Sequence, residues 1–449
     1  MSTASRFYTR LPPWLLLVGA MAAVGPVSID MYLPGFPQIE QDFGQRGIEV
    51  TMAAYMVGIA VGQLFYGPVS DRFGRKSPLY VGFALYTIGS LGCVFATSLT
   101  MLTATRVLQA LGGCAGMVIG RAIVRDRCEP HEAARAFSTL MMIVALGPVI
   151  APALGGIFVA TLGWRSTFVF QAMFGVALMF AMHRVLTDTP SPLPTIVALD
   201  VPATGALTAV ALRVGGTSEA SAGSDSRRES ERGSSSVPPR RSPKLSVAYS
   251  LHRYLYLLRD GTFLGYSLLG GFAMGGLFAY IAGAPTVLPQ QYGLSAQQFG
   301  WLIGLNGLTF MLASRMNLRA LRKYGPAEAV ARHVWLPLGF GLALLLAASL
   351  MAPPLGLLLG LQLSYFVGVG RVTPHAAALA MAPHGQDAGA ASGMMGALHS
   401  LVAMIVSIVV AAVNDGTVST LAAIMTVTAV CSALSYVWIR RCERSAGST

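Results

Sequence analysis

A short charged turn between two apolar runs is the feature that most constrains this chain. The segment from Gly67 to Leu79, GPVSDRFGRKSPL, separates two apolar runs that are each about 20 residues long, the length at which a helix spans a bilayer. The turn carries three cations and one acid, and positively charged turns between membrane helices stay in the cytosol. It therefore predicts a polytopic membrane protein and assigns one loop to the cytosolic side.

The composition agrees with this class of protein. Hydrophobic residues make up 54% of the 449 residues and charged residues only 11%, so a water-soluble fold would have no place for its apolar surface. The net charge of +12 does not indicate nucleic-acid binding, because the cations cluster in loops on one side of the predicted membrane. The five cysteines are widely spread, so we expect no disulfide framework, no metal site and no cofactor.

Twelve apolar runs fall into two groups of six. A second basic turn, MNLRALRKYGP at 316–326, lies in the second group where the charged turn lies in the first, which predicts an internal repeat. The expected fold is all-α, with six-helix bundles at 1–186 and 261–449 and both termini in the cytosol. The predicted spans are 14–36, 48–68, 78–97, 101–123, 137–161, 164–185, 263–288, 296–316, 330–351, 355–379, 391–413 and 419–438.

The segment 187–260 differs from the rest of the chain. It is basic and rich in Ser and Pro, which predicts a largely disordered cytosolic linker. An apolar stretch within it, 194–214, contains Asp200 and Pro202. A thirteenth crossing there would move the later basic turns to the outside, so we do not count it as a span.

Two ionisable residues lie deep inside predicted spans of the first bundle. Asp30, in SIDMYLP, and Arg106, in RVLQALGG, are each about 8 to 10 Å from the outer boundary at a rise of 1.5 Å per residue. A carboxylate at such a depth costs about 2.5 to 3.5 kcal/mol, so it needs water, a proton or a partner. We expect the two residues to face one cavity and to form a pair that breaks and re-forms during the working cycle. The alternatives are a carboxyl group that caps a broken helix and an arginine that reaches the outer headgroups.

The fifth span carries the motif GPVIAPALGG. Pro148 and Pro152 each remove a backbone hydrogen bond, and the nearby Gly147, Gly155 and Gly156 remove side-chain bulk. This pattern predicts a bent helix that packs closely against its neighbours.

With these motifs in view, the chain resembles the major facilitator superfamily, and within it the drug:proton antiporters of the bicyclomycin and chloramphenicol resistance (Bcr/CflA) type. The matching segments are SIDMYLP, GPVSDRFGRK, RVLQALGG and GPVIAPALGG, and only the linker lies outside the resemblance. The sequence departs from the family in its long linker and in Arg371 and His375, which occupy GRVTPH in the tenth span.

The resemblance implies roles for three groups of residues. Asp30 and Arg106 couple transport to protons, and the residues of the GPVIAPALGG motif named above act in the conformational change. A gating role falls on Gly67, Asp71, Arg72, Gly74, Arg75 and Lys76. Asp71 is expected close to the start of the eleventh span, where a carboxylate at a helix N-terminus gains about 0.3 to 1 kcal/mol and can act as a releasable latch.

The expected mechanism is alternating access, in which substrate and proton compete at Asp30. One charge that moves through 100 mV supplies about 2.3 kcal/mol, enough to drive a useful gradient. The substrate is expected near the midplane between the bundles, and it is expected to be an uncharged or weakly basic, partly apolar compound. The candidate contacts are Met31, Tyr32, Met142, Tyr280 and Asn306.

Two other functions remain open at this point. The first is export of a metabolite, such as an amino acid or a sugar, by the same fold. The second is a membrane receptor or enzyme that does not transport, but the sequence has no HExxH, GxSxG or GxxxxGK[ST] motif and no large external domain. We therefore expect a non-enzymatic, monomeric, multi-pass protein of a bacterial inner membrane, with protons, small molecules and lipid as its partners.

Overall fold

The computed structural model describes residues 12–128, 130–186 and 247–446, and every regular element within them is a helix. The first half of the chain forms α1 (Pro13–Asp30), η2 (Leu33–Gly35), α2 (Phe36–Phe43), α3 (Val50–Phe73), α4 (Lys76–Val94), α5 (Leu99–Arg127), α6 (Pro130–Leu162) and α7 (Arg165–Val185). The second half forms α8 (Val247–Arg259), α9 (Gly261–Tyr292), α10 (Ala296–His333), α11 (Trp335–Leu350), α12 (Leu355–Met381), η3 (Ala382–Asp387), α13 (Ala388–Val413) and α14 (Val418–Ala446).

Eleven helical stretches in the described part of the chain are long and apolar enough to cross a membrane. The predicted span 296–316 is not one of them, because polar residues such as Asn306 and Arg315 lower its hydropathy. This part of α10 nevertheless packs against both α6 and α12, as a helix inside a bundle does. The prediction of twelve crossings is therefore supported by composition for eleven of them.

The two basic turns have the same backbone conformation. Gly74 ends α3 with φ 78° and ψ 173°, and Gly325 interrupts α10 with φ 75° and ψ 169°. Only glycine adopts this region at low cost, because a Cβ atom would clash with the backbone. The break predicted over 316–326 is thus confined to one residue, since the helix continues on both sides of Gly325. The match between the turns agrees with the predicted internal repeat.

The first predicted span is not one continuous helix. The α-helix ends at Asp30, a short 3-10 helix follows at Leu33–Gly35, and α2 continues from Phe36. Pro34 and Pro37 lack the backbone N–H that an unbroken helix would need. The carboxyl group of Asp30 therefore lies at a helix end and not along a helix.

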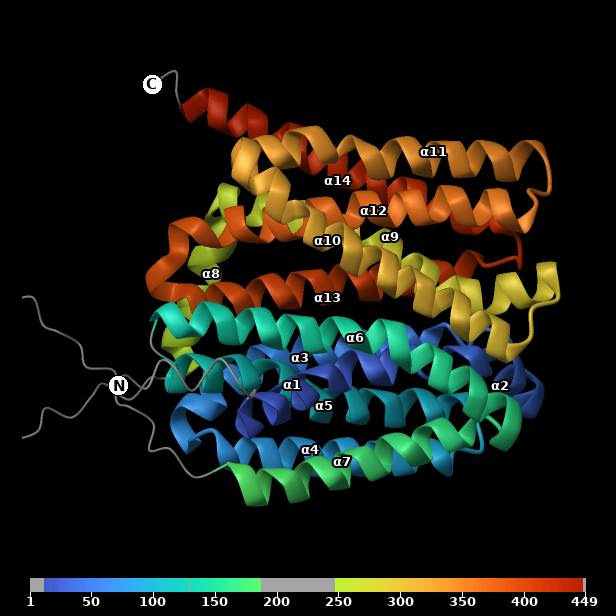
Figure 1. Ribbon diagram of the computed structural model, residues 1–449, viewed down its shortest axis with the longest axis horizontal. Helices are drawn as coiled ribbons and strands as arrows, with labels where there is room; N and C mark the ends of the chain where they lie inside the picture. The colour runs from blue at the N-terminus through green and yellow to red at the C-terminus, as the bar shows by residue number, and fades with distance from the viewer. Residues whose placement is uncertain (1–11, 129, 187–246, 447–449) are drawn as a thin grey trace, which may run out of the picture. The chain divides into compact units, whose positions relative to one another are not determined.

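Both groups of helices belong to one compact unit. In the first group α1 lies against α5 and α6, and α4 lies between α5 and α7; in the second group α9 contacts α12, α13 and α14 (Figure 1). The principal contacts between the groups are made by two helix pairs, α3 with α13 and α6 with α10. The α6–α10 pair connects the two parts of the site described below.

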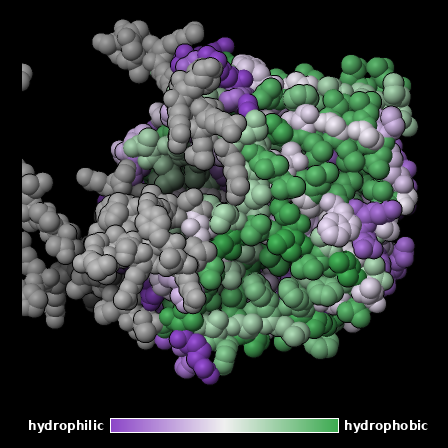
Figure 2. Space-filling view, viewed as in Figure 1, coloured by the Kyte–Doolittle hydropathy of each residue, from purple (hydrophilic) through white to green (hydrophobic). Residues whose placement is uncertain are grey.

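The outer surface has the character expected for contact with lipid. Figure 2 shows a mostly hydrophobic face, with hydrophilic residues gathered toward its ends. Large apolar side chains such as Phe180, Leu346 and Leu434 are about three-fifths exposed. Because soluble proteins rarely expose an apolar face of this size, the surface agrees with a membrane protein.

The helix α8 forms within the last part of the predicted linker, and residues 187–246 lie outside the described residues. Asp260 follows α8 and caps α9, because its Oδ1 accepts hydrogen bonds from the backbone N–H groups of Thr262 and Phe263. Its Oδ2 lies 2.9 Å from Nε2 of His384 in η3. These contacts hold the end of α8 against the second helical group.

Candidate functional site

Asp30 is an isolated buried acid in the first helical group. It is 3% exposed, and its carboxyl group makes no hydrogen bond or ion pair with any residue that the structure describes. The residue is the last of α1, and the carbonyl oxygen of the next residue, Met31, meets α6 at Gly155. A buried carboxylate without a partner is costly, so the charge on Asp30 depends on its access to water or protons.

Arg106 is the centre of a buried polar network. Its Nη1 donates to the carbonyl oxygen of Ser28 at 3.0 Å and to Oε1 of Gln109 at 2.6 Å. The amide nitrogen of Gln109 in turn donates to Ser90 and Gln171, both at 2.7 Å. The network therefore joins α1, α4, α5 and α7.

The guanidinium group of Arg106 also lies between two aromatic rings. Its central carbon is 4.2 Å from the ring centroid of Tyr32 and 4.1 Å from that of Tyr55. Cation–π contacts of this kind stabilise a cation that is removed from water. The Nε and Nη2 atoms of Arg106 are buried without a hydrogen-bond partner among the described residues, so the cation keeps donors to offer.

Asp30 and Arg106 are not paired in this conformation. No ion pair within 4.0 Å joins them, although both residues are described. Ser28 and Gln109 engage Nη1 of the guanidinium group, and Tyr32 and Tyr55 cover its faces, while Nε and Nη2 remain available. The expected pair is thus absent here, and its formation in another state of the cycle remains a prediction.

The helix α6 connects the end of α1 to the second helical group through its glycines and prolines. On one side, a Cβ at Gly147 would touch Pro26, and a Cβ at Gly155 would collide with the carbonyl oxygen of Met31. The sequence predicted this close packing, and the contacts confirm it.

The other side of α6 packs against α10. The carbonyl oxygens of Pro148 and Pro152 meet α10 at Gly307 and Gly300, and Gly156 lies against the carbonyl oxygen of Ala296. Small residues on both helices allow their backbones to approach this closely. A movement at the end of α1 therefore acts on a helix that also contacts the second group.

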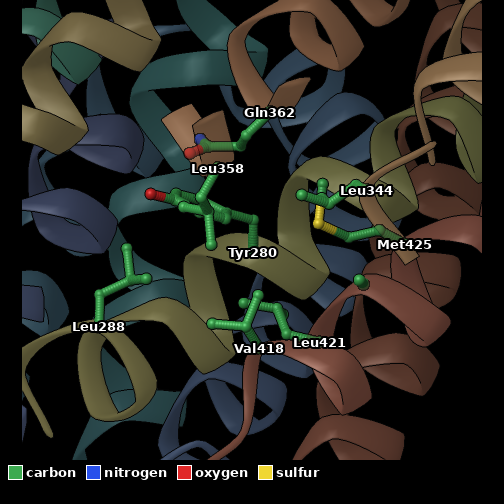
Figure 3. A pocket seen from close by; sticks show the side chains of 9 residues that line it. Tyr280, Leu288, Leu344, Leu358, Gln362, Val418, Leu421 and Met425 are labelled. Carbon is green, nitrogen blue, oxygen red and sulfur yellow. The ribbon is translucent and has the colours of Figure 1, made fainter. Parts of the chain in front are cut away.

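Three polar side chains are buried together in the second group. Tyr280, Asn306 and Gln362 are at most 4% exposed and come from α9, α10 and α12. The Tyr280 hydroxyl lies within range of both amide groups, but none of the five polar side-chain atoms has a hydrogen-bond partner of good geometry among the described residues. Figure 3 shows the polar ends of Tyr280 and Gln362 turned to the same side of a small pocket that is otherwise lined by apolar side chains.

The five predicted substrate contacts do not form one group. Met31 and Tyr32 are fully buried beside Arg106 or α6, and Tyr280 and Asn306 belong to the polar cluster in the second group. Met142 is 44% exposed on α6, so it is not packed in the interior with the others. The amide of Gln362 was not predicted, because a lone glutamine in an apolar run does not indicate a site.

The charged turn is fastened to the end of α5. Nε of Arg75 lies 2.8 Å from Oδ2 of Asp126, and Nη1 of Arg75 donates to Oγ of Ser70. Arg72 is exposed and lies over the ring of Phe73, Lys76 begins α4, and Gly67 has no atom within 4 Å of a Cβ built on it. The side chain of Asp71 lies outside the described residues, so its predicted latch is not tested.

A polar contact that the sequence did not predict joins the two groups at the opposite end of the helices. Oε1 of Glu49, at the start of α3, accepts hydrogen bonds from Asn414 Nδ2 at 2.6 Å and from Thr286 Oγ1 at 3.1 Å. Asn414 also donates to Thr286 at 2.9 Å. Glu49 is only 2% exposed, but it stands at the edge of a predicted span, where an acid looks like an ordinary loop residue.

Comparisons with known proteins all point to one family of transporters. The profile of the Major Facilitator Superfamily matches residues 16–407. The chain is 32% identical to the uncharacterized MFS-type transporter YdgK of Bacillus subtilis, over 94% of this chain and 93% of that protein. It is 26% identical to the bicyclomycin resistance protein homolog of Haemophilus influenzae, over 95% of this chain and 96% of that protein. A bacterial homolog of the human lysosomal transporter Spinster, solved facing inward and unoccupied, is 15% identical, with a TM-score of 0.68 over 98% of this chain and 97% of that one.

Proposed function

The chain belongs to the major facilitator superfamily, and we propose that it exports drug-like small molecules in exchange for protons. The proposal of drug export is supported by the similarity to a bicyclomycin resistance protein homolog over almost the whole length of both chains. Proton coupling and alternating access are the parts of the proposal that depend on the site itself.

The observation that carries the proposal is the position of Asp30. A buried acid without a partner ends the helix whose next residue contacts α6, and α6 contacts α10 on its other side. Loss or gain of a proton at Asp30 changes the charge at the end of α1, and the close contacts pass any resulting shift to the second group. We infer that protonation of Asp30 and rearrangement of the two groups occur as one coupled event.

We assign the polar cluster of the second group to the substrate. Tyr280 and Gln362 line a small, otherwise apolar pocket, and Asn306 lies within range of Tyr280, so the cluster offers donors and acceptors in apolar surroundings that suit partly apolar compounds with few charges. Tyr32 supplies an aromatic face beside Arg106, and Met31 supplies an adaptable thioether at the end of α1. Binding between these sets would let substrate and proton compete.

We infer the orientation of the chain in the membrane from the positive charge of its turns. The end of the bundle with the two basic turns is assigned to the cytosol, and the end with Glu49 to the outside, in the inner membrane of a bacterium. The chain then crosses twelve times, with α10 up to Gly325 as the crossing that composition does not identify.

Expression in a bacterium that lacks its own efflux pumps tests the function. The chain should raise resistance to several compounds, bicyclomycin and chloramphenicol among them, and Asp30→Asn should abolish the gain while protein level and folding stay normal. Asp415→Asn, which changes an exposed acid in the loop before α14, is the matched control and should behave as the unmodified chain. In proteoliposomes, an imposed pH gradient should drive transport by the unmodified chain but not by Asp30→Asn.

Two results would count against the proposal. Equal gradient-driven transport by Asp30→Asn would refute the proton-coupling role of Asp30. A chain that confers no resistance but lowers the cell content of an amino acid or sugar would belong to the metabolite exporters instead.

A further inference from the structure

Arg371 is a cation on α12 without a counter-ion. Its Nη1 lies 3.1 Å from Nε2 of His333, and its Nη2 lies 3.9 Å from the sulfur of Met316. Among the described residues, no carboxylate lies within ion-pair distance of the guanidinium group. A positive charge inside or beside a membrane is costly unless an anion accompanies it, so this arginine lacks a partner that its position demands.

Two nitrogen atoms of this cluster are buried without a hydrogen-bond partner among the described residues. They are Nε of Arg371 and Nε2 of His375, whereas Nδ1 of His333 lies within range of the backbone carbonyl group of Ala329. His375 is only 4% exposed, and His333 lies within electrostatic range of both Arg371 and His375. Unsatisfied donors beside a cation that has no counter-ion favour a group with several acceptor oxygens.

The cluster faces away from the proposed substrate pocket. Arg371 follows Gln362 by nine residues, which at 3.6 residues per turn is about two and a half turns, so the two side chains leave α12 on opposite sides. Met316, which the guanidinium touches, is 47% exposed on the apolar outer surface. The cluster therefore borders the surface that faces lipid.

The cluster lies toward the headgroups of one leaflet, because His333 is three residues inside the predicted span 330–351 and Arg371 reaches it from about 12 Å inside the span 355–379. Trp335, two residues after His333, is 47% exposed and packs edge-on against Tyr436. Exposed tryptophan and tyrosine residues collect at the membrane–water interface, so they mark its level on this side of the bundle. Gly325, the second turn glycine, is eight residues before His333, which assigns this level to the same end as the basic turns.

We propose that Arg371 and His375, with His333 positioning the guanidinium group, bind the phosphate of an anionic phospholipid in the cytosolic leaflet. A phosphate offers several acceptor oxygens to these donors and supplies the missing negative charge, and membrane lipids present it near this level. The site is independent of proton coupling, and only the name of the leaflet rests on the proposed sidedness. Sequence comparison alone marked Arg371 and His375 as departures from the family without giving them a role.

Lipid retention in native mass spectrometry tests this site. The full-length chain is purified in neutral detergent and titrated with phosphatidylglycerol, phosphatidylcholine or inorganic phosphate. The unmodified chain should retain phosphatidylglycerol at lower concentration than phosphatidylcholine. Arg371→Gln should weaken that retention by about fivefold, the change expected for one basic residue at an anionic surface.

A second cation supplies the matched control. Arg184, exposed at the end of α7 and stacked on Phe180, carries the same charge on the first helical group, so Arg184→Gln reports the general effect of one lost charge and should weaken retention clearly less than Arg371→Gln does. Arg371→Lys keeps the charge and should restore most of the retention, which separates loss of the site from misfolding.

The outcomes decide between the sources of the phosphate. Retention of phosphatidylglycerol that Arg371→Gln leaves unchanged would overturn the site. Equal retention of phosphatidylcholine, or displacement of the bound phosphatidylglycerol by an equal concentration of inorganic phosphate, would overturn the assignment to an anionic lipid.

Discussion

The contact at Glu49 should hold one end of the two helical groups together. Its carboxylate accepts two hydrogen bonds from residues of the second group, Thr286 and Asn414, although Glu49 itself belongs to the first. Glu49→Gln keeps an acceptor oxygen of the same shape but removes the charge. Because a hydrogen bond to a charged group is stronger than a neutral one by about 1 kcal/mol, two bonds lose about 2 kcal/mol in total.

This loss applies only to the conformation in which the contact is formed. The ratio of molecules open at this end to molecules closed there should therefore rise about 30-fold, since each 1.4 kcal/mol corresponds to a factor of ten. Spin labels at Thr100 and Gln291 are both exposed at this end and lie on different groups. Double electron–electron resonance spectroscopy would report the opening as a longer distance between the two labels. The five native cysteines are replaced by alanine beforehand.

Glu40→Gln is the matched control for this measurement. Glu40 lies at the same end, but its carboxylate accepts a hydrogen bond from Gly47 of its own group, so its replacement should leave the distance unchanged. If Glu49→Gln gives the same distance distribution as the unmodified chain, the contact does not hold the two groups together and the reasoning fails.

Three further predictions concern stability in detergent. Arg106→Lys loses the planar fit between Tyr32 and Tyr55, so the free energy of unfolding should fall by about 2 kcal/mol, and an unchanged denaturation curve would contradict the role of these rings. Gly155→Ala should lower the free energy of unfolding by about 1 to 3 kcal/mol, because its Cβ would collide with Met31. Gly339→Ala, whose Cβ meets no atom within 4 Å, should have no such cost. Equal melting temperatures of the two variants would refute the close packing of α1 on α6. Arg75→Gln should cost about 3 kcal/mol by leaving Asp126 without its main partner, and a double-mutant cycle with Asp126→Asn that shows simple additivity would argue against their coupling.

Local pattern was sufficient for much of the fold. The apolar runs predicted the helices, and the two basic turns predicted where glycine would break them, as Gly74 and Gly325 do. The GPVIAPALGG motif predicted a closely packed helix, which the contacts of α6 confirm. These features depend on residues that are near one another in the chain, so a sequence window contains all the information they need.

The partners of the buried polar residues could not be predicted in the same way. Gln109 lies one turn after Arg106, so helical periodicity could have predicted that the two side chains form a hydrogen bond. Nothing in the sequence indicated that Gln171, 62 residues later, would accept a hydrogen bond from that amide. The break of α1 at Asp30 was signalled only by the prolines that follow it.

The sequence by itself determined that the chain is a helical membrane protein and predicted that its two halves are similar, because hydrophobicity, charge bias and glycine act locally. Only the tertiary structure decided that Arg106 bonds to Ser28 and Gln109 and not to Asp30, and that Glu49 meets Asn414 across 365 residues. Each of these polar groups had several chemically suitable partners. The choice among them was made by the packing of whole helices, which brings distant residues into contact.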